Sequence, residues 1–171
     1  MTAIEEVKKH IQHLVKYRML FLIRPTPQQL NDYLKNTISD YLGIEFIETG
    51  TDYLIARMPI NERTRQSLGF LHGGVSCLLA EQIGSMGANL FLNRETHVAL
   101  GLDINANHVR GVKDGFVYGK ASPLHIGIRT QVWEIKITNE AQELVCISRL
   151  TMAVVPITAE TIRKQDLEDL L

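Results

Sequence analysis

A predominantly apolar stretch of 18 residues, at positions 75–92, constrains the fold of this chain more than any other feature. It reads VSCLLAEQIGSMGANLFL, and its length and composition predict a helix. A helix that is apolar on nearly all sides is stable only when other elements cover it. The sequence therefore predicts one long helix that is wrapped by a β-sheet built from the rest of the chain.

Glu81 is the single charged residue in this stretch. Burying a lone carboxylate is costly unless a partner compensates the charge, so one interpretation is a structural carboxylate paired with a cation. The other is a functional group, because burial tunes its pKa and its nucleophilicity. Gly73 and Gly74 leave backbone N–H groups open to another molecule at the positive end of the helix dipole. A carboxylate and an anion-stabilising helix terminus together outline a site for acyl transfer or hydrolysis.

The bulk composition is typical of one soluble globular domain. The chain has 171 residues, of which 45% are hydrophobic and 22% are charged. Its net charge of −1 excludes a global basic field that would attract nucleic acid. Cys77 and Cys146 have no metal-binding spacing and are predicted to be small buried hydrophobes in a reducing compartment. No signal peptide and no apolar run of membrane-spanning length is evident, so a cytoplasmic protein is expected.

The N-terminal part of the chain has helical periodicity. Residues 3–23 and residues 27–41 carry apolar side chains at three- and four-residue spacing, and the segment Arg24-Pro25-Thr26-Pro27 separates them. Basic residues on the first predicted helix leave two interpretations open, contact with a membrane surface or packing against its own domain or a partner subunit. We predict a helical extension, one domain and a C-terminal tail, at residues 1–26, 27–156 and 157–171.

Short runs with β-strand character occupy residues 44–48, 53–58, 97–110, 115–122, 128–137 and 143–155. Asp114-Gly115 predicts a tight turn between the third and fourth runs, and short connections favour antiparallel pairing. The last run is apolar on both parities at residues 144–147, which predicts a central strand covered on both faces. Trp133 is expected in the core.

A spaced motif crosses the start of the long helix: Gln66-(x5)-His72-Gly73-Gly74-(x6)-Glu81-(x3)-Ser85. It resembles the hotdog-fold acyl-CoA thioesterases, in the branch with glutamate on the central helix that includes 4-hydroxybenzoyl-CoA and 1,4-dihydroxy-2-naphthoyl-CoA thioesterases. Residues 104–110 and 123–127 also resemble that branch, and the similarity covers about residues 24–156. The resemblance implies an α+β hotdog fold, an antiparallel β-sheet wrapped around one long central helix. It further implies hydrolysis of an acyl-CoA, with an aromatic acyl group favoured, and no metal or cofactor beyond the CoA of the substrate.

The resemblance assigns the Gly73 N–H to polarise the thioester carbonyl as its oxygen gains charge. Gln66 adds an amide donor, holds the acyl group, or is an ordinary polar loop residue. His72 orients the loop or Gln66, or is structural. Glu81 acts as a nucleophile through a mixed anhydride, or as a general base on water. Ser85 lies four residues on, on the same helix face, where it holds the water or the carboxylate, or is simply a small packed residue.

Six further positions are predicted to contact CoA: Gly101, His108, Arg110, His125, Gly127 and Arg129. An arginine suits phosphate because its guanidinium offers a fork of donors. The backbone around the two glycines can lie along the pantetheine arm. The alternative is that all six form a solvated rim of the sheet.

Gly73 and Glu81 are eight residues apart, or about 12 Å along one helix, so they cannot reach one carbonyl from the same chain. A second, antiparallel copy of the helix brings its Glu81 opposite the first copy's Gly73, which predicts a two-fold dimer with two shared sites. The resemblance implies the same arrangement, with dimers pairing into a tetramer. Gly84, Gly87 and Ala88 are the small residues expected to permit close helix packing.

Other functions remain open at this stage. A hotdog dehydratase or hydratase and a non-catalytic acyl-CoA-binding protein are the alternatives to a thioesterase. The sequence does not distinguish CoA from an acyl-carrier protein as the carrier of the acyl group.

Overall fold

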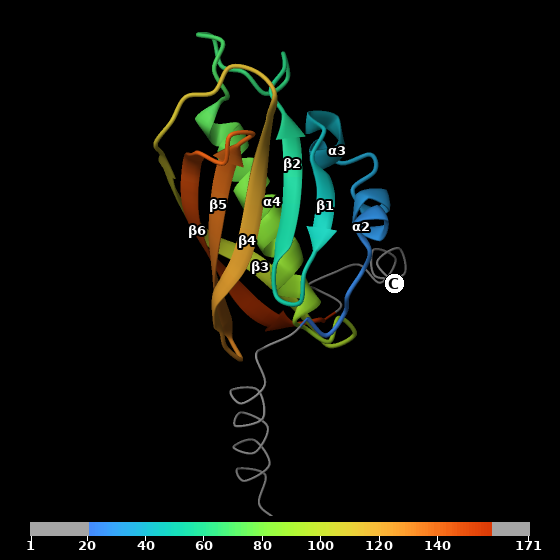
Figure 1. Cartoon of the computed structure of the whole chain (residues 1–171). Helices are drawn as coiled ribbons and strands as arrows, with labels where there is room; N and C mark the ends of the chain where they lie inside the picture. Colours follow the sequence, from blue (N-terminus) through green and yellow to red (C-terminus); the bar gives the residue numbers. More distant parts are fainter. Residues whose placement is uncertain (1–20, 159–171) are drawn as a thin grey trace, which may run out of the picture.

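The computed structural model describes residues 21–158, in which a six-stranded antiparallel sheet curves around one long helix (Figure 1). The elements, in chain order, are α2 (Pro27–Tyr33), α3 (Ile38–Leu42), β1 (Glu45–Thr49), β2 (Leu54–Pro59), α4 (Gly73–Leu90), β3 (His97–His108), β4 (Phe116–Ile126), β5 (Thr130–Asn139) and β6 (Leu144–Pro156). Helix α4 contacts β2, β3, β4, β5 and β6. The predicted α+β class and the wrapped central helix are therefore confirmed.

The strand order across the sheet is β1-β2-β4-β5-β6-β3. Asp114-Gly115 was expected to join two neighbouring strands by a tight turn, and this prediction is wrong. Gly115 does adopt a positive φ of 72°, but β3 pairs with β6 at the far edge while β4 pairs with β2 and β5. The connecting residues 109–115 instead cross the end of the sheet, where Leu71 N donates to Val112 O at 2.8 Å.

The predicted helix at residues 27–41 is broken into two. Asn36 has a φ of 63°, in the left-handed region, so α2 cannot continue into α3. The predicted helix at residues 3–23 lies outside the described residues except for residues 21–23, which are not helical. All but the first two residues of the predicted tail, 157–171, also lie outside them.

The core lies between α4 and the concave face of the sheet. Leu79, Ile83 and Trp133 are fully buried there. Gly84 and Gly87 let the sheet approach, because an added Cβ would lie 2.6 Å from Leu150 and 2.8 Å from the Trp133 ring, respectively. These two glycines therefore pack against the sheet of their own chain, and the expectation that they serve helix-to-helix packing is wrong.

Ala88, the third small residue, is fully buried, and its carbonyl accepts a hydrogen bond from Gln131 Nε2 at 3.2 Å. Gln131 Oε1 in turn accepts from Trp133 Nε1 at 3.0 Å. This buried chain of bonds ties the C-terminal half of α4 to β5. Cys146 is buried as predicted, whereas Cys77 is only half-buried, and both are free thiols.

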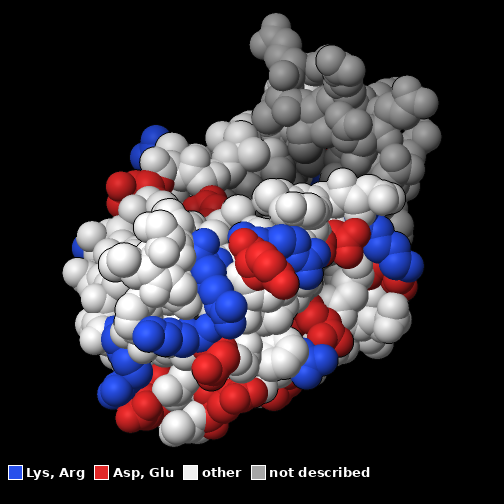
Figure 2. All heavy atoms as spheres, turned by 90° about the horizontal axis from the view of Figure 1, so that it is seen from above, with Lys and Arg blue, Asp and Glu red and all other residues white. Residues whose placement is uncertain are grey.

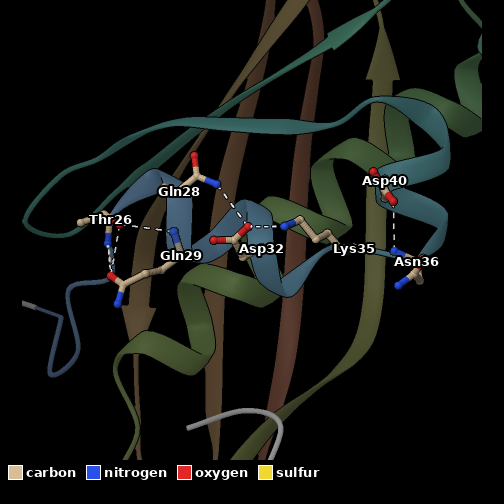
Figure 3. A network of polar contacts seen from close by, with 7 residues as sticks. All are labelled: Thr26, Gln28, Gln29, Asp32, Lys35, Asn36 and Asp40. Carbon is tan, nitrogen blue, oxygen red and sulfur yellow. Dashed lines mark hydrogen bonds and ion pairs between the residues drawn. The ribbon is translucent and has the colours of Figure 1, made fainter.

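The two edges of the sheet differ. At the β1 edge, Asn31 of α2 donates to Phe46 O at 2.9 Å and accepts from Phe46 N at 2.7 Å, so α2 occupies part of that edge. A capping box starts α2, and polar contacts run along α2 towards α3 through Thr26, Gln28, Gln29, Asp32, Lys35, Asn36 and Asp40 (Figure 3). The β3 edge is longer, and it exposes Leu100 and Leu102.

Candidate active site

His72 directly precedes helix α4, and its Nδ1 accepts a hydrogen bond from Gly74 N at 2.9 Å. His72 thus serves as the N-cap of the helix. Within residues 21–158, no hydrogen bond joins His72 to Gln66, and the Gly73 N–H has no acceptor. The N-cap leaves this one donor of the first turn available to a ligand.

A pocket of about 530 Å³ opens beside Gly73, and its lining residues are Gln66, Phe70, Leu71, Gly73, Ser76, His108, Val109, Arg110, Gly111 and Val145. The imidazole of His108 lies against the start of α4, since a Cβ added to Gly73 would be 3.0 Å from His108 Nε2. This pocket brings four predicted residues together, two from the catalytic set and two from the CoA-binding set. Basic and acidic side chains are intermixed over this end of the molecule (Figure 2).

Gln66 sits in a tight local turn. Its backbone N–H donates to Phe70 O at 2.8 Å, its carbonyl accepts from Gly69 N at 2.9 Å, and its Oε1 accepts from Leu68 N. With Oε1 engaged, the Nε2 amide is the group of this side chain that remains to donate to a ligand.

Glu81 is half-buried on α4, and burial raises the pKa of its carboxyl above the ordinary value of 4.5. Within the described part of the chain, no cation pairs with it, which removes the structural ion-pair interpretation for residues 21–158. A Cβ added to Gly101 would lie 2.5 Å from Glu81 Oε1. Gly101 therefore makes room for the carboxylate beside β3.

Asn89 fixes β3 to α4 close to that carboxylate. Its Nδ2 donates to Ala99 O at 3.2 Å, and its Oδ1 accepts from Ala99 N at 2.9 Å. The same Nδ2 donates to Ser85 O at 3.0 Å. The pairing of β3 with β6 then becomes irregular between Gly101 and Asp103, beside Glu81.

Comparison with known proteins identifies the family. The model of the thioesterase superfamily matches residues 68–146. The 1,4-dihydroxy-2-naphthoyl-CoA hydrolase of Escherichia coli is 45% identical over 136 residues, which is 80% of this chain and 99% of the hydrolase. A mutant thioesterase from Pseudomonas aeruginosa superposes with a TM-score of 0.79 at 43% identity, covering 81% of this chain and 99% of that one. The chain belongs to the thioesterase superfamily.

The hotdog fold expected for this thioesterase is likewise confirmed by the solved structures of its relatives. A thioesterase from Haemophilus influenzae superposes with a TM-score of 0.78 at 45% identity, over 81% of this chain and 96% of that one. The enzyme class predicted from the motif, a thioester hydrolase, is also that of these relatives.

Within one chain of this thioesterase, the predicted residues fall into two groups. The first group lines the pocket at the start of α4 and consists of Gln66, Gly73, His108 and Arg110, with His72 adjacent. The second group contains Glu81, Ser85 and Gly101, together with His125, Gly127 and Arg129 at the β4–β5 connection. We call the first set of residues the donor group, after the N–H donors of Gly73 and Gln66, and the second set the carboxylate group, after Glu81.

Strand register separates the two groups. Thr130 pairs with Ala153, which pairs with Leu100 of β3, so the β4–β5 connection lies at the level of Gly101. His108 is seven residues further along β3, or about 23 Å away. The sequence did not reveal this separation of the predicted CoA-contacting residues. We call the end of the sheet that carries the donor group the donor end. Arg110 lies there and pairs with Glu143, with 3.3 Å between Nη2 and Oε1.

Two residues near the site were not predicted. Ser76 is 2% exposed and lines the pocket one helical turn after Gly73, so its spacing from that glycine was an available signal. Asn89 is an amide in the apolar stretch, but its contact with Ala99 depends on tertiary structure that no local pattern encodes.

Residues 21–158 contain no helix with the length and apolar character required to cross a bilayer. In the same range, no three His, Cys, Asp or Glu side chains gather as a potential metal-binding set.

Proposed function

We propose that this thioesterase hydrolyses an acyl-CoA thioester to the free acid and CoA, with an aromatic acyl group preferred and no further cofactor. The observation that carries the proposal is the half-buried, unpaired carboxylate of Glu81 on a helix whose Gly73 N–H is free within the described residues. The aromatic preference is supported by the name of the E. coli relative, a 1,4-dihydroxy-2-naphthoyl-CoA hydrolase.

The Gly73 N–H and the Gln66 Nε2 donate to the carbonyl oxygen as it gains negative charge. On one route, Glu81 takes a proton from water, whose oxygen bonds to the carbonyl carbon, and the C–S bond then breaks to release CoA thiolate. On the other route, a Glu81 oxygen attacks the carbonyl carbon, CoA thiolate leaves, and water hydrolyses the mixed anhydride. Ser85, one turn after Glu81, is positioned to hold the water or the carboxylate.

The separation of the donor group from the carboxylate group supports a shared site. If two copies pair antiparallel along β3, the His108 end of one strand lies beside the Gly101 end of the other. The donor group of each chain then meets the carboxylate group of its partner, in two equivalent sites. The long β3 edge supports this pairing, because Leu100 is 45% exposed and Leu102 is 62% exposed on a strand with no neighbour on its outer side within the described residues.

The same pairing supports a CoA-binding surface built from both chains. His108 and Arg110 lie at the donor end of one chain. His125, Gly127 and Arg129 lie at the opposite end of the sheet, which the two-fold operation brings to the first chain's donor end. We propose that these side chains and the Gly127 backbone contact the CoA portion of the substrate.

Release of free thiol from a panel of aromatic, short aliphatic and long aliphatic acyl-CoAs tests the proposed function. We expect thiol release, fastest with an aromatic acyl group. A dehydratase would instead change the absorbance of an enoyl-CoA without releasing thiol, and a binding protein would do neither. Either of those results would contradict the proposal.

A further inference from the structure

A hollow opens on the outer side of α4, between α2 and the C-terminal half of the helix. Its volume is about 330 Å³, and the residues that matter for its chemistry are Tyr33, Leu34, Ser85, Met86 and Arg94. We call it the Ser85 hollow. It is separate from the pocket at Gly73, with which it shares no lining residue.

The Ser85 hollow lies within reach of the proposed reacting carbon. Ser85 follows Glu81 by one helical turn, or about 6 Å along the axis. Arg94 follows the end of α4 by four residues and lines the same hollow as Ser85. An acyl group whose carbonyl is held at Glu81 can therefore run past Ser85 and Met86 towards Arg94.

Three of the residues that line the hollow are apolar or aromatic, and the other five are polar: Thr37, Gln82, Ser85, Asn89 and Arg94. Leu34 is 3% exposed and Met86 is 7% exposed, and the Tyr33 side chain adds an aromatic ring. These three side chains favour the hydrocarbon part of an acyl group, because binding removes their apolar surface from water. An apolar surface alone does not select what stands at the far end of that hydrocarbon.

Arg94 supplies the charge that can make this selection. It is half-buried, and within residues 21–158 its guanidinium has no ion pair and no hydrogen-bond acceptor. Asp32 is the acidic residue in the adjoining hollow that Arg94 also lines, but its carboxylate is already paired with Lys35 at 2.7 Å (Figure 3). A half-buried guanidinium binds a carboxylate well, through paired N–H donors.

We propose that the Ser85 hollow binds the acyl group and that Arg94 selects acyl groups carrying a second carboxylate at their far end. The substrate class is then the monothioester of a dicarboxylic acid, aromatic or aliphatic, with about 13 Å available along α4 between the levels of Glu81 and Leu90. This inference rests on the proposed acyl-CoA hydrolysis and specifies its substrate.

The test compares acyl-CoAs that differ only in the terminal carboxylate. The pairs are octanedioyl-CoA with octanoyl-CoA, and 6-carboxy-2-naphthoyl-CoA with 2-naphthoyl-CoA. We expect the wild-type kcat/KM for thiol release to be at least about tenfold higher for the carboxylated member of at least one pair. Arg94→Gln should abolish this ratio by lowering kcat/KM on the carboxylated substrate alone. Arg94→Lys, which keeps the charge, should retain part of it.

Arg149→Gln is the matched control, because Arg149 is an exposed arginine on the face of β6 opposite the buried Leu150. It should leave the ratio unchanged. Thermal unfolding of each variant shows whether the fold is intact. A wild-type enzyme that hydrolyses both members of each pair equally well, or an Arg94→Gln variant that loses activity on both equally, overturns the role of Arg94 while the proposed function stands. Absence of thiol release from every substrate overturns the proposed function, and this inference with it.

Discussion

Glu81 combines a half-buried carboxyl, a raised pKa and the lack of a cationic partner within the described residues. The sequence predicted the isolated carboxylate because no other charge occurs in the apolar stretch. It did not predict Gly101 as the neighbour that makes room for it, because that contact joins a helix to a strand edge. The site therefore depends on one chemical group that is visible in the sequence and on a space that only the fold creates.

Replacing Glu81 with glutamine should abolish most of the activity. The amide keeps the shape of the side chain but can neither accept a proton from water nor form an anhydride. We expect kcat for thiol release to fall by about 10³-fold or more, with an unfolding midpoint no lower than that of the wild type. Glu134→Gln is the control, since that glutamate pairs with Lys136 at 2.9 Å away from the pocket. Near-native turnover in the folded Glu81→Gln variant would exclude a catalytic role.

The raised pKa of Glu81 predicts how activity and stability depend on pH. Glu81 acts as the carboxylate on either route, so kcat should fall as the pH is lowered through a pKa above the ordinary value of 4.5. The folded state holds this proton more tightly than the unfolded chain. The free energy of unfolding should therefore decrease as the pH rises from the ordinary pKa through the raised one. Denaturation at several pH values should show this slope in the wild type and its absence in Glu81→Gln.

Arg110 tests the proposed CoA surface. Its guanidinium is about half exposed and pairs with Glu143 at the donor end. Arg110→Ala should raise KM for acyl-CoA and change kcat little, because it removes binding far from the reacting carbonyl. A truncated thioester that lacks the nucleotide should be hydrolysed equally by both proteins. An equal loss on the full-length and truncated substrates would refute the assignment.

The strand ranges and the long helix were predictable because each follows from local pattern. Helix α4 begins at Gly73, so the two glycines lie at its start as predicted, and it ends at Leu90, two residues before the end of the apolar stretch. Strand pairing was less predictable. Asp114-Gly115 does encode a local turn conformation. The pairing of β3 with β6, however, depends on contacts between residues that are far apart in the sequence. The break at Asn36 likewise depends on one left-handed residue within a helical pattern.

The contact between α4 and β3 can be tested through Asn89. Asn89→Ala removes both hydrogen bonds to Ala99 and should lower the free energy of unfolding by about 1–3 kcal/mol. It should also lower kcat, since it loosens the strand that carries Gly101. Asn89→Asp keeps the acceptor for Ala99 N and should lose less stability at neutral pH. A variant that loses stability while retaining full kcat would show that the hydrogen bonds between Asn89 and Ala99 do not position Glu81.

At the scale of the whole fold, residues 21–158 form a sheet with one open edge, at β3, and two separated halves of a site. The sequence predicted that one chain cannot complete the site, because helical rise alone places Gly73 and Glu81 about 12 Å apart. It did not indicate which edge would pair. In the structure, the Asn31 side chain hydrogen-bonds the Phe46 backbone at the β1 edge, whereas β3 leaves two leucines exposed. This asymmetry favours β3 as the dimer edge.

Subunit exchange tests the shared site directly. Gln66→Ala and Glu81→Ala proteins should each be inactive, because the first impairs the donor group and the second removes the carboxylate. In a mixed dimer, one site carries both substitutions and the other carries neither. Random exchange makes about half of the dimers mixed, with one intact site of two in each, so activity should recover to about a quarter of the wild-type value. If both residues served one site within a single chain, every site would remain impaired. A lack of recovery after exchange has been verified by mass spectrometry would therefore exclude the shared site.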